Sequence, residues 1–225
     1  MTAPVSIIIP CFRDENALAV LLERLGALSR EPLDIIVVDG AASAGCAAIA
    51  GSHGARYLSR SSPRGARMVA GAGEATAPVL WFLHADALVP DAALPSIRTA
   101  IEAGAAGGFF RFAFAGPPSF TKKFLAAMVN WRCRFGIPYG DQGIFMTAEA
   151  YEEAGGHGPL PLFEEVELVR NARRTGAFRP LDVALPVNAR RWERDGYWRR
   201  TLVNRLMALG FSLGISAERL ARWYR

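Results

Sequence analysis

The sequence is poor in the residues from which disulfide frameworks and zinc centres are built. It has three cysteines and three histidines in 225 residues. The cysteines (Cys11, Cys46 and Cys133) lie far apart and form no Cys-x-x-Cys pair. That spacing argues against a disulfide framework and a structural zinc site, and the histidines are too scattered for a histidine-rich metal centre.

The sequence also lacks long apolar runs. None reaches the ~18 residues that a membrane-spanning helix requires. The first residues carry no basic stretch and Pro10 interrupts the first apolar run, so a signal peptide is not expected. With 51% hydrophobic and 21% charged residues, the composition excludes a disordered or collagen-like chain. We therefore expect a folded, cytoplasmic protein.

Positive charge is concentrated near the end of the chain. The formal net charge is +5, and residues 190–225 hold nine arginines against three acidic residues, a local +6. The remainder has 17 basic and 18 acidic residues, a net −1. This imbalance predicts anionic partners for the tail: phosphates, lipid headgroups or nucleic acid.

Short β-branched runs alternate with helical patterns over the first hundred residues. Buried strands are expected at 5–10, 34–40, 56–58 and 78–83, and helices at 18–28, 65–77 and 91–103. Beyond them we expect a strand at 107–114, helices at 119–135 and 164–175, and a loop at 136–143. Continuous apolar strands that alternate with helices predict an α/β fold, with a mostly parallel central sheet covered by helices on both faces.

The chain is expected to form one domain, 1–195, with an extension, 196–225. The extension reads as two basic amphipathic helices, 196–213 and 216–223. Their apolar faces fit packing on the main domain, a homodimer, or peripheral contact with the inner face of a membrane. We favour packing on the main domain.

Two aspartates stand where predicted strands end. Ligands of parallel sheets bind beyond the carboxyl ends of the strands, where Asp39 and Asp86 lie. Asp86 can hold a divalent cation that bridges two phosphates, or simply cap the turn that follows. Asp39 can accept hydrogen bonds from a ribose or base, or serve only the turn.

A cluster of carboxylates and two groups of arginines complete the candidate residues. Glu164, Glu165 and Glu167 lie within four residues, and either one of them is a general base or all three stabilise a helix N-terminus. Arginine matches phosphate oxygens in a bidentate fork, and a neighbouring tryptophan adds a stacking surface. The residues that fit this use are Arg64, Arg67, Arg191 and Trp192.

In their order along the chain these motifs resemble those of family 2 glycosyltransferases, inverting enzymes of the GT-A fold that use nucleotide-sugar donors. The run 6–15 resembles the family's Ser-Ile-Ile-Ile-Pro start, and 37–45 resembles its Val-Val-Asp-Gly loop. His84-Ala85-Asp86 stands where the family has Asp-x-Asp, and Phe163-Glu164-Glu165 where it has Glu-Asp. Residues 188–192, Asn-Ala-Arg-Arg-Trp, resemble Gln-x-x-Arg-Trp.

The resemblance implies roles for individual residues. Pro10, Glu15 and Asp39 would line the nucleotide pocket, and Arg191 and Trp192 would bind the diphosphate or the acceptor. Asp86 would bind the Mg²⁺ or Mn²⁺ that holds the donor diphosphate. Glu165 would deprotonate an acceptor hydroxyl, with Asp141 as a second candidate.

Four positions depart from the family pattern: Arg13, Ala44, His84 and Glu165. His84 replaces an aspartate, and histidine can coordinate Mn²⁺ but is a poor ligand for Mg²⁺. His-Ala-Asp, Gly-Asp-Gln and Ala-Arg-Arg-Trp-Glu also resemble a small bacterial subgroup associated with radical-SAM proteins and suggested for arsenosugar synthesis.

The expected activity is metal-dependent, inverting transfer from a UDP- or GDP-sugar to an unknown acceptor, which can be lipid-linked or amphiphilic. One alternative is a sugar-phosphate nucleotidyltransferase, but 10–13 is not the Gly-rich basic loop that such enzymes place after the first strand. Another is a non-catalytic basic module for membrane surfaces or nucleic acid, which the aromatic and basic tail fits. The acidic strand ends would repel polyanions, so no nucleic acid is expected.

Overall fold

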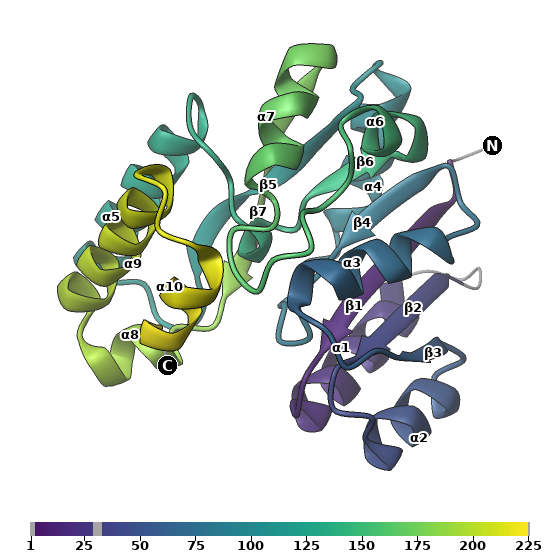
Figure 1. Ribbon diagram of the computed structural model, residues 1–225. Coiled ribbons are helices and arrows are strands. Elements are labelled where there is room, and N and C mark those ends of the chain that lie inside the picture. Colours follow the sequence, from purple (N-terminus) through teal and green to yellow (C-terminus); the bar gives the residue numbers. More distant parts are fainter. Residues whose placement is uncertain (1–2, 29–32, 225) are drawn as a thin grey trace.

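The computed structural model describes residues 3–28 and 33–224 and has a seven-stranded sheet at its centre (Figure 1). The strand order is β3-β2-β1-β4-β6-β5-β7. The strands are β1 (Val5–Cys11), β2 (Asp34–Asp39), β3 (Arg56–Ser59), β4 (Val79–Phe82), β5 (Gly107–Phe114), β6 (Phe145–Thr147) and β7 (Phe178–Val187). Only β6 runs antiparallel to its neighbours, so the sheet is mostly parallel, as the sequence predicts.

The described helices cover both faces of this sheet and extend beyond one end of it (Figure 1). They are α1 (Glu15–Leu28), α2 (Ala44–Ser52), α3 (Arg64–Gly73), α4 (Ala93–Glu102), α5 (Phe120–Cys133), α6 (Ala148–Glu153), α7 (Val166–Thr175), α8 (Arg190–Asp195), α9 (Tyr197–Ser212) and α10 (Ala217–Trp223), with a 3-10 turn, η1 (Gly140–Gln142). None of the helices within residues 3–28 and 33–224 is long and apolar enough to cross a membrane.

Burial on both faces explains why the strands are continuously apolar. All seven residues of β1 are buried. Ile7 and Ile9 join a cluster with the apolar sides of α1, α2 and α4. Ile8, on the other face, joins Met68 of α3 and Leu168 of α7. Each such side chain contributes roughly 1.5–3 kcal/mol to stability, so the double-sided core fixes the strand order on which the site depends.

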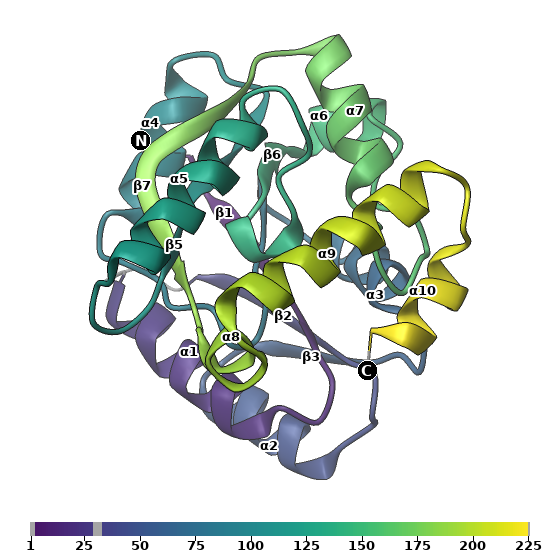
Figure 2. The same cartoon turned by 90° about the vertical axis from the view of Figure 1, so that its left-hand side faces the viewer.

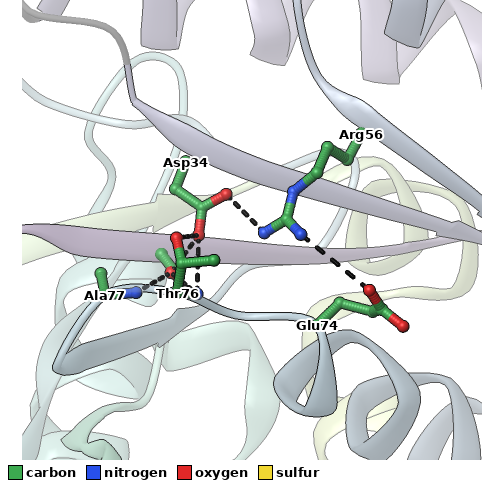
Figure 3. Close-up of polar contacts among 6 residues, drawn as sticks. Asp34, Arg56, Glu74, Thr76 and Ala77 are labelled. Carbon is green, nitrogen blue, oxygen red and sulfur yellow. Dashed lines mark hydrogen bonds and ion pairs between the residues drawn. The ribbon is translucent and has the colours of Figure 1, made fainter.

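The amino ends of the strands are tied together by Asp34 (Figure 3). Its carboxylate accepts hydrogen bonds from Ser6, from Thr76 Oγ1 at 2.9 Å and from Arg56 Nη2 at 2.6 Å. Burial alone would raise the pKa of Asp34, but these hydrogen bonds outweigh burial and hold the pKa below its ordinary value. The network joins β1, β2, β3 and the α3–β4 turn, and leaves the opposite, carboxyl edge of the sheet open for ligands.

The last helices lie on one side of the molecule together with α5 (Figures 1 and 2). Strand β7 pairs with β5 and leads directly into α8. Rings connect α9 to the rest: Phe124 to Trp198 with centroids 5.9 Å apart, and Phe163 to Phe211 at 4.7 Å. The two expected terminal helices are present as α9 and α10, whereas α2, α6, α8 and β6 were not expected from the sequence.

Candidate active site

A cavity of about 650 Å³ lies at the carboxyl ends of the parallel strands. Its wall comes from the β1–α1 loop, α3, the segment after β4, η1, the loop before α7, the end of β7, α8 and α9. Nine of the eleven residues singled out in the sequence line it: Pro10, Arg64, Arg67, His84, Asp86, Asp141, Glu165, Arg191 and Trp192. The fold thus brings together side chains as far apart in the sequence as Pro10 of the first strand and Trp192 of α8.

The other two candidates, Glu15 and Asp39, are not among the described residues that line this cavity. Asp39 is fully buried, and its carboxylate accepts from Ser43 N at 2.6 Å, Ala41 N at 2.8 Å and Tyr57 Oη at 3.1 Å. These bonds hold the β2–α2 loop. A role for Glu15 and Asp39 in nucleotide binding stays a prediction.

The two arginines of α3 have different surroundings. The Arg67 guanidinium is buried, donates to the Cys11 carbonyl and lies 5.8 Å from the Phe12 ring. A Cβ at Gly40 would lie 2.8 Å from Arg67 Nη1, so a side chain there would displace the guanidinium. Arg67 therefore holds the β1–α1 loop, whereas Arg64 faces the acidic pair.

Glu164 and Glu165 lie side by side but have different partners. Glu164 is only 2% exposed and forms an ion pair with Arg64. Glu165 accepts from the Gly140 amide with Oε1 at 2.9 Å, and its Oε2 has no hydrogen-bond partner among the described residues. Burial, and then the negative charge of Glu164, raise the pKa of Glu165 to about 8, against the opposing charge of Arg64. Glu165 can therefore accept a proton near neutral pH.

The loop that carries this pair is held under backbone strain. The sequence predicts a helix over 164–175, which would include both glutamates. In the structure α7 begins at Val166, so both glutamates lie in the turn before it. Phe163 has a positive φ of 61°, which is unusual for a bulky residue. Its ring packs between Tyr139 at 5.9 Å and Phe211 of α9 at 4.7 Å. These two aromatic contacts hold the strained residue next to Glu164.

Glycine permits the close approach of α3 to the same loop. A Cβ at Gly65 would lie 1.9 Å from the Gly158 carbonyl oxygen. The Gly65 amide donates to the Leu160 carbonyl at 2.9 Å. This contact places Arg64, the neighbouring residue, beside Glu164.

The segment after β4 carries the candidate metal ligands. Asp86 lines the cavity, and Asp14 lies close enough that the charge of Asp86, after burial, raises the pKa of Asp14. His84 Nε2 lies 3.4 Å from Arg64 Nη1. Burial, and then the charges of Arg64 and Arg191, lower the pKa of His84 to about 3, so its imidazole is neutral.

A metal cage made by the protein alone is not present in residues 3–28 and 33–224, since no three His, Cys, Asp or Glu side chains there are grouped to hold an ion. The carboxylate of Asp86 nevertheless fits Mg²⁺ or Mn²⁺ sites, which commonly use one or two carboxylates and complete their ligands with substrate phosphates and water. His84 fits less well, because a cation at its Nε2 would lie beside the Arg64 guanidinium.

Helix α8 supplies the basic part of the wall. Arg190, Arg191 and Arg194 line the cavity, and their charges suit phosphate oxygens. The Trp192 ring lies 5.1 Å from Phe114 in an edge contact, so it is anchored to the sheet. Asp141 also lines the cavity, and burial raises its pKa despite the charge of Arg132.

Some lining residues were not anticipated from the sequence. Asp14 follows the end of β1, so the strand-end argument used for Asp39 and Asp86 could have found it. Tyr139, Asn204, Met207 and Tyr224 carry no such signal. They reach the cavity through the packing of η1, α9 and the end of α10, which local pattern does not encode.

Comparison with known proteins gives the family and the fold. The family described as Glycosyl transferase family 2 matches residues 6–148, well over half of the chain. A search among curated proteins finds no match.

Solved structures resemble most of the chain at low sequence identity. A mannosyltransferase from Pyrobaculum calidifontis in complex with GDP-Man and Mn²⁺ matches with a TM-score of 0.68 and 16% identity, over 96% of this chain and 66% of that one. Mannosyl-3-phosphoglycerate synthase from Rubrobacter xylanophilus matches at 0.56 and 17%, over 92% and 75%. Glucosyl-3-phosphoglycerate synthase from Mycobacterium tuberculosis, with Mn²⁺, UDP and glucosyl-3-phosphoglycerate, matches at 0.55 and 15%, over 80% and 71%.

About a third of the mannosyltransferase has no counterpart in this chain. The family match and the shared architecture agree with the motifs at the strand ends and with the cavity that joins them. The chain belongs to glycosyl transferase family 2 and is a glycosyltransferase with a GT-A fold.

Proposed function

We propose that this glycosyltransferase moves a sugar from a nucleoside-diphosphate sugar to an acceptor hydroxyl, with inversion and with help from a divalent cation. The observation that carries the proposal is the single cavity lined by Asp86, the arginines of α8 and Glu165. Such a transfer needs three kinds of group: a carboxylate to hold the metal ion, guanidinium groups to bind the phosphates, and a proton acceptor.

The donor diphosphate would lie against Arg190 and Arg191, whose guanidinium groups match its oxygens and offset the charge that grows as it leaves. Asp86 would hold Mg²⁺ or Mn²⁺, which when bound neutralises charge on the diphosphate. The anchored ring of Trp192 fixes the position of α8 and thereby of these arginines.

Glu165 would remove the acceptor proton. The acceptor oxygen forms a bond to the anomeric carbon, the bond from that carbon to the diphosphate breaks, and the proton moves to Glu165 Oε2. This oxygen is free of protein partners among the described residues, while Oε1 is held by the Gly140 amide. Attack on the face opposite the leaving group inverts the anomeric carbon. Asp141 is the second candidate for the same role.

The proposal assigns the cation to Asp86 without His84. The neutral His84 ring, 3.4 Å from Arg64, would instead hold that arginine in place between the acidic pair and the cavity. The structural neighbours include complexes with GDP-Man and with UDP, so the donor is proposed only as a nucleoside-diphosphate sugar. The narrower arsenosugar-type resemblance is not needed for this proposal.

A thermal-shift series tests the proposal. UDP- and GDP-sugars are added with and without Mn²⁺, and a donor should raise the melting temperature far more with Mn²⁺ than without it. Asp86→Ala should lose the Mn²⁺-dependent part of the shift. The matched control is Asp91→Ala, an aspartate that pairs with Arg24 away from the cavity.

A transfer assay with the donor so identified tests the base. Glu165→Gln should keep the Mn²⁺-dependent shift and lose turnover by at least 10²-fold, as removal of a general base typically does. Full turnover in Glu165→Gln would move the role to Asp141. Normal turnover and donor binding in Asp86→Ala would refute the cation assignment.

A further inference from the structure

Two surface helices carry matching stripes of exposed apolar side chains. The stripe of α5 has Phe120, Phe124, Met128, Trp131 and Phe135, and that of α9 has Trp198, Leu202, Leu206, Leu209 and Leu213. Both follow the same spacing of four, four, three and four residues, which keeps the members within each helix on one side of it. Phe135 and Leu213 lie just past the ends of α5 and α9. Their exposed fractions lie between 44% and 82%. We call these ten residues the α5–α9 face.

The two stripes form one surface. The rings of Phe124 and Trp198 lie 5.9 Å apart, and Phe120 stacks on Phe124 at 6.1 Å. Figures 1 and 2 show α5 and α9 side by side on the same side of the molecule. The face exposes on the order of 1,000 Å² of apolar surface, since a large side chain presents about 150–250 Å², whereas the largest patch of a monomer is usually a few hundred Å².

The charged residues of the two helices are all basic, and two of them pair with acidic residues of α8: Lys122 with Glu193 at 3.6 Å and Arg200 with Asp195 at 3.3 Å. Neither α5 nor α9 contains an acidic residue, and residues 103–140 and 196–217 contain none at all. Lys123, Arg134 and Arg199 are exposed within or next to the two helices. A second copy of this chain would bring the same positive charges against each other, because a two-fold interface pairs a surface with itself.

We propose that the α5–α9 face docks on an anionic lipid bilayer. Aromatic rings and leucines on one side of a helix, flanked by basic residues, suit the headgroup boundary, where the rings enter the apolar edge and the cations contact phosphates. The helices would lie in the plane of the surface. Helix α9 also lines the cavity with Asn204 and Met207, so docking would bring the cavity close to hydroxyls held at the membrane.

This surface differs from the tail expected from the sequence, because half of it comes from α5. From the sequence, membrane contact of 196–225 is one alternative to packing on the main domain. In the structure, Met207 and Arg200 of α9 are buried while its leucines are exposed. The stripe of α5 contributes four aromatic rings to the face, those of Phe120, Phe124, Trp131 and Phe135.

Vesicle co-sedimentation of the full chain tests the proposal without using its activity. Vesicles of phosphatidylcholine with phosphatidylglycerol should pellet the protein at low salt, and vesicles of phosphatidylcholine alone should pellet at least tenfold less. Trp131→Ser combined with Leu206→Ser should weaken binding at least tenfold. Lys123→Glu combined with Arg199→Glu should weaken it most at low salt, where charge is least screened.

The matched control is Val20→Ser combined with Val69→Ser, which changes exposed apolar residues of α1 and α3 outside the face. The control should bind as the parent does, and unchanged melting temperatures show that all variants are folded. No binding to anionic vesicles, or binding that the face variants leave unchanged, overturns the proposal. A parent dimer in light scattering that the face variants dissociate, without vesicle binding, would assign the face to a second copy instead.

Discussion

Replacing Glu164 by glutamine should move the acidic limb of the pH–rate profile to lower pH. Glu164 acts on the proposed base in two ways that have the same sign. The negative charge of Glu164 raises the pKa of Glu165 directly. Glu164 also pairs with Arg64, whose positive charge lowers the pKa of Glu165, and this ion pair weakens that effect of Arg64. The glutamine variant removes the negative charge and frees the guanidinium, so both changes favour ionised Glu165.

The size of the shift follows from the surroundings of Glu165. Burial is the largest cause of its raised pKa of about 8 and remains in the variant, so the value should not return to 4.5. We expect a fall of at least one pH unit, which corresponds to about 1.4 kcal/mol. Well below the pKa, this change raises the ionised fraction about tenfold, and transfer there should rise in proportion as long as proton removal limits the rate.

The assay is kcat measured across pH with saturating donor, acceptor and Mn²⁺. Glu167→Gln is the control, because Glu167 is exposed and pairs with Arg170. A limb that stays in place or moves to higher pH refutes the assignment of Glu165. It would favour Asp141, whose pKa is raised by burial and by the charge of Asp86, against the charges of Arg132 and Arg64.

Three further predictions concern stability. Asp34→Ala should lower the free energy of unfolding at pH 7 by about 2–3 kcal/mol. Because folding lowers the pKa of Asp34, the parent should lose this contribution as the pH falls through the folded pKa. Urea titrations of both proteins at pH 7 and pH 3 measure the difference. Burial lowers the pKa of His157 to about 3, so between pH 6.5 and 3 this side chain takes up a proton only in the unfolded chain. The free energy of unfolding of the parent should therefore fall over this pH range, and it should fall less in His157→Gln. Gly65→Ala should cost at least about 3 kcal/mol in thermal or urea unfolding, because its Cβ meets Gly158 O at 1.9 Å, whereas Gly26→Ala in open space should be neutral or stabilising. Equal stability of the two alanine variants would contradict the packing described between α3 and the acidic loop.

The sequence predicted the positions of elements best where the residues of one element are buried along its whole length. The strands β1, β2 and β4 are apolar along their whole length because helices cover both faces, so their positions could be predicted closely. Helix α2 escaped prediction because its small residues (Ala44–Ser52) form no apolar stripe, and it depends on a cap from Ser43. Strand β6 has only three residues and gains its place from pairing with β4 and β5.

The same distinction holds for the candidate site. Asp86 was found because it follows a predicted strand, and Asp14 was missed although it follows β1 in the same way. Asn204 and Tyr224 reach the cavity only through tertiary packing. The leucine spacing of α9 reveals a stripe, but periodicity does not say whether protein, lipid or water covers it.

The stack of Phe211 on Phe163 joins α9 to the residue that precedes the acidic pair. A strained φ persists only while its surroundings enforce it, so α9 helps to set the position of Glu165 from outside the catalytic loop. Thermodynamic linkage makes this influence mutual. A ligand that orders the loop also stabilises the packing of α9 against it, and a surface that binds α9 also stabilises the ordered loop. Helix α9 is therefore part of the cavity wall and also a support for the loop that carries the proposed base.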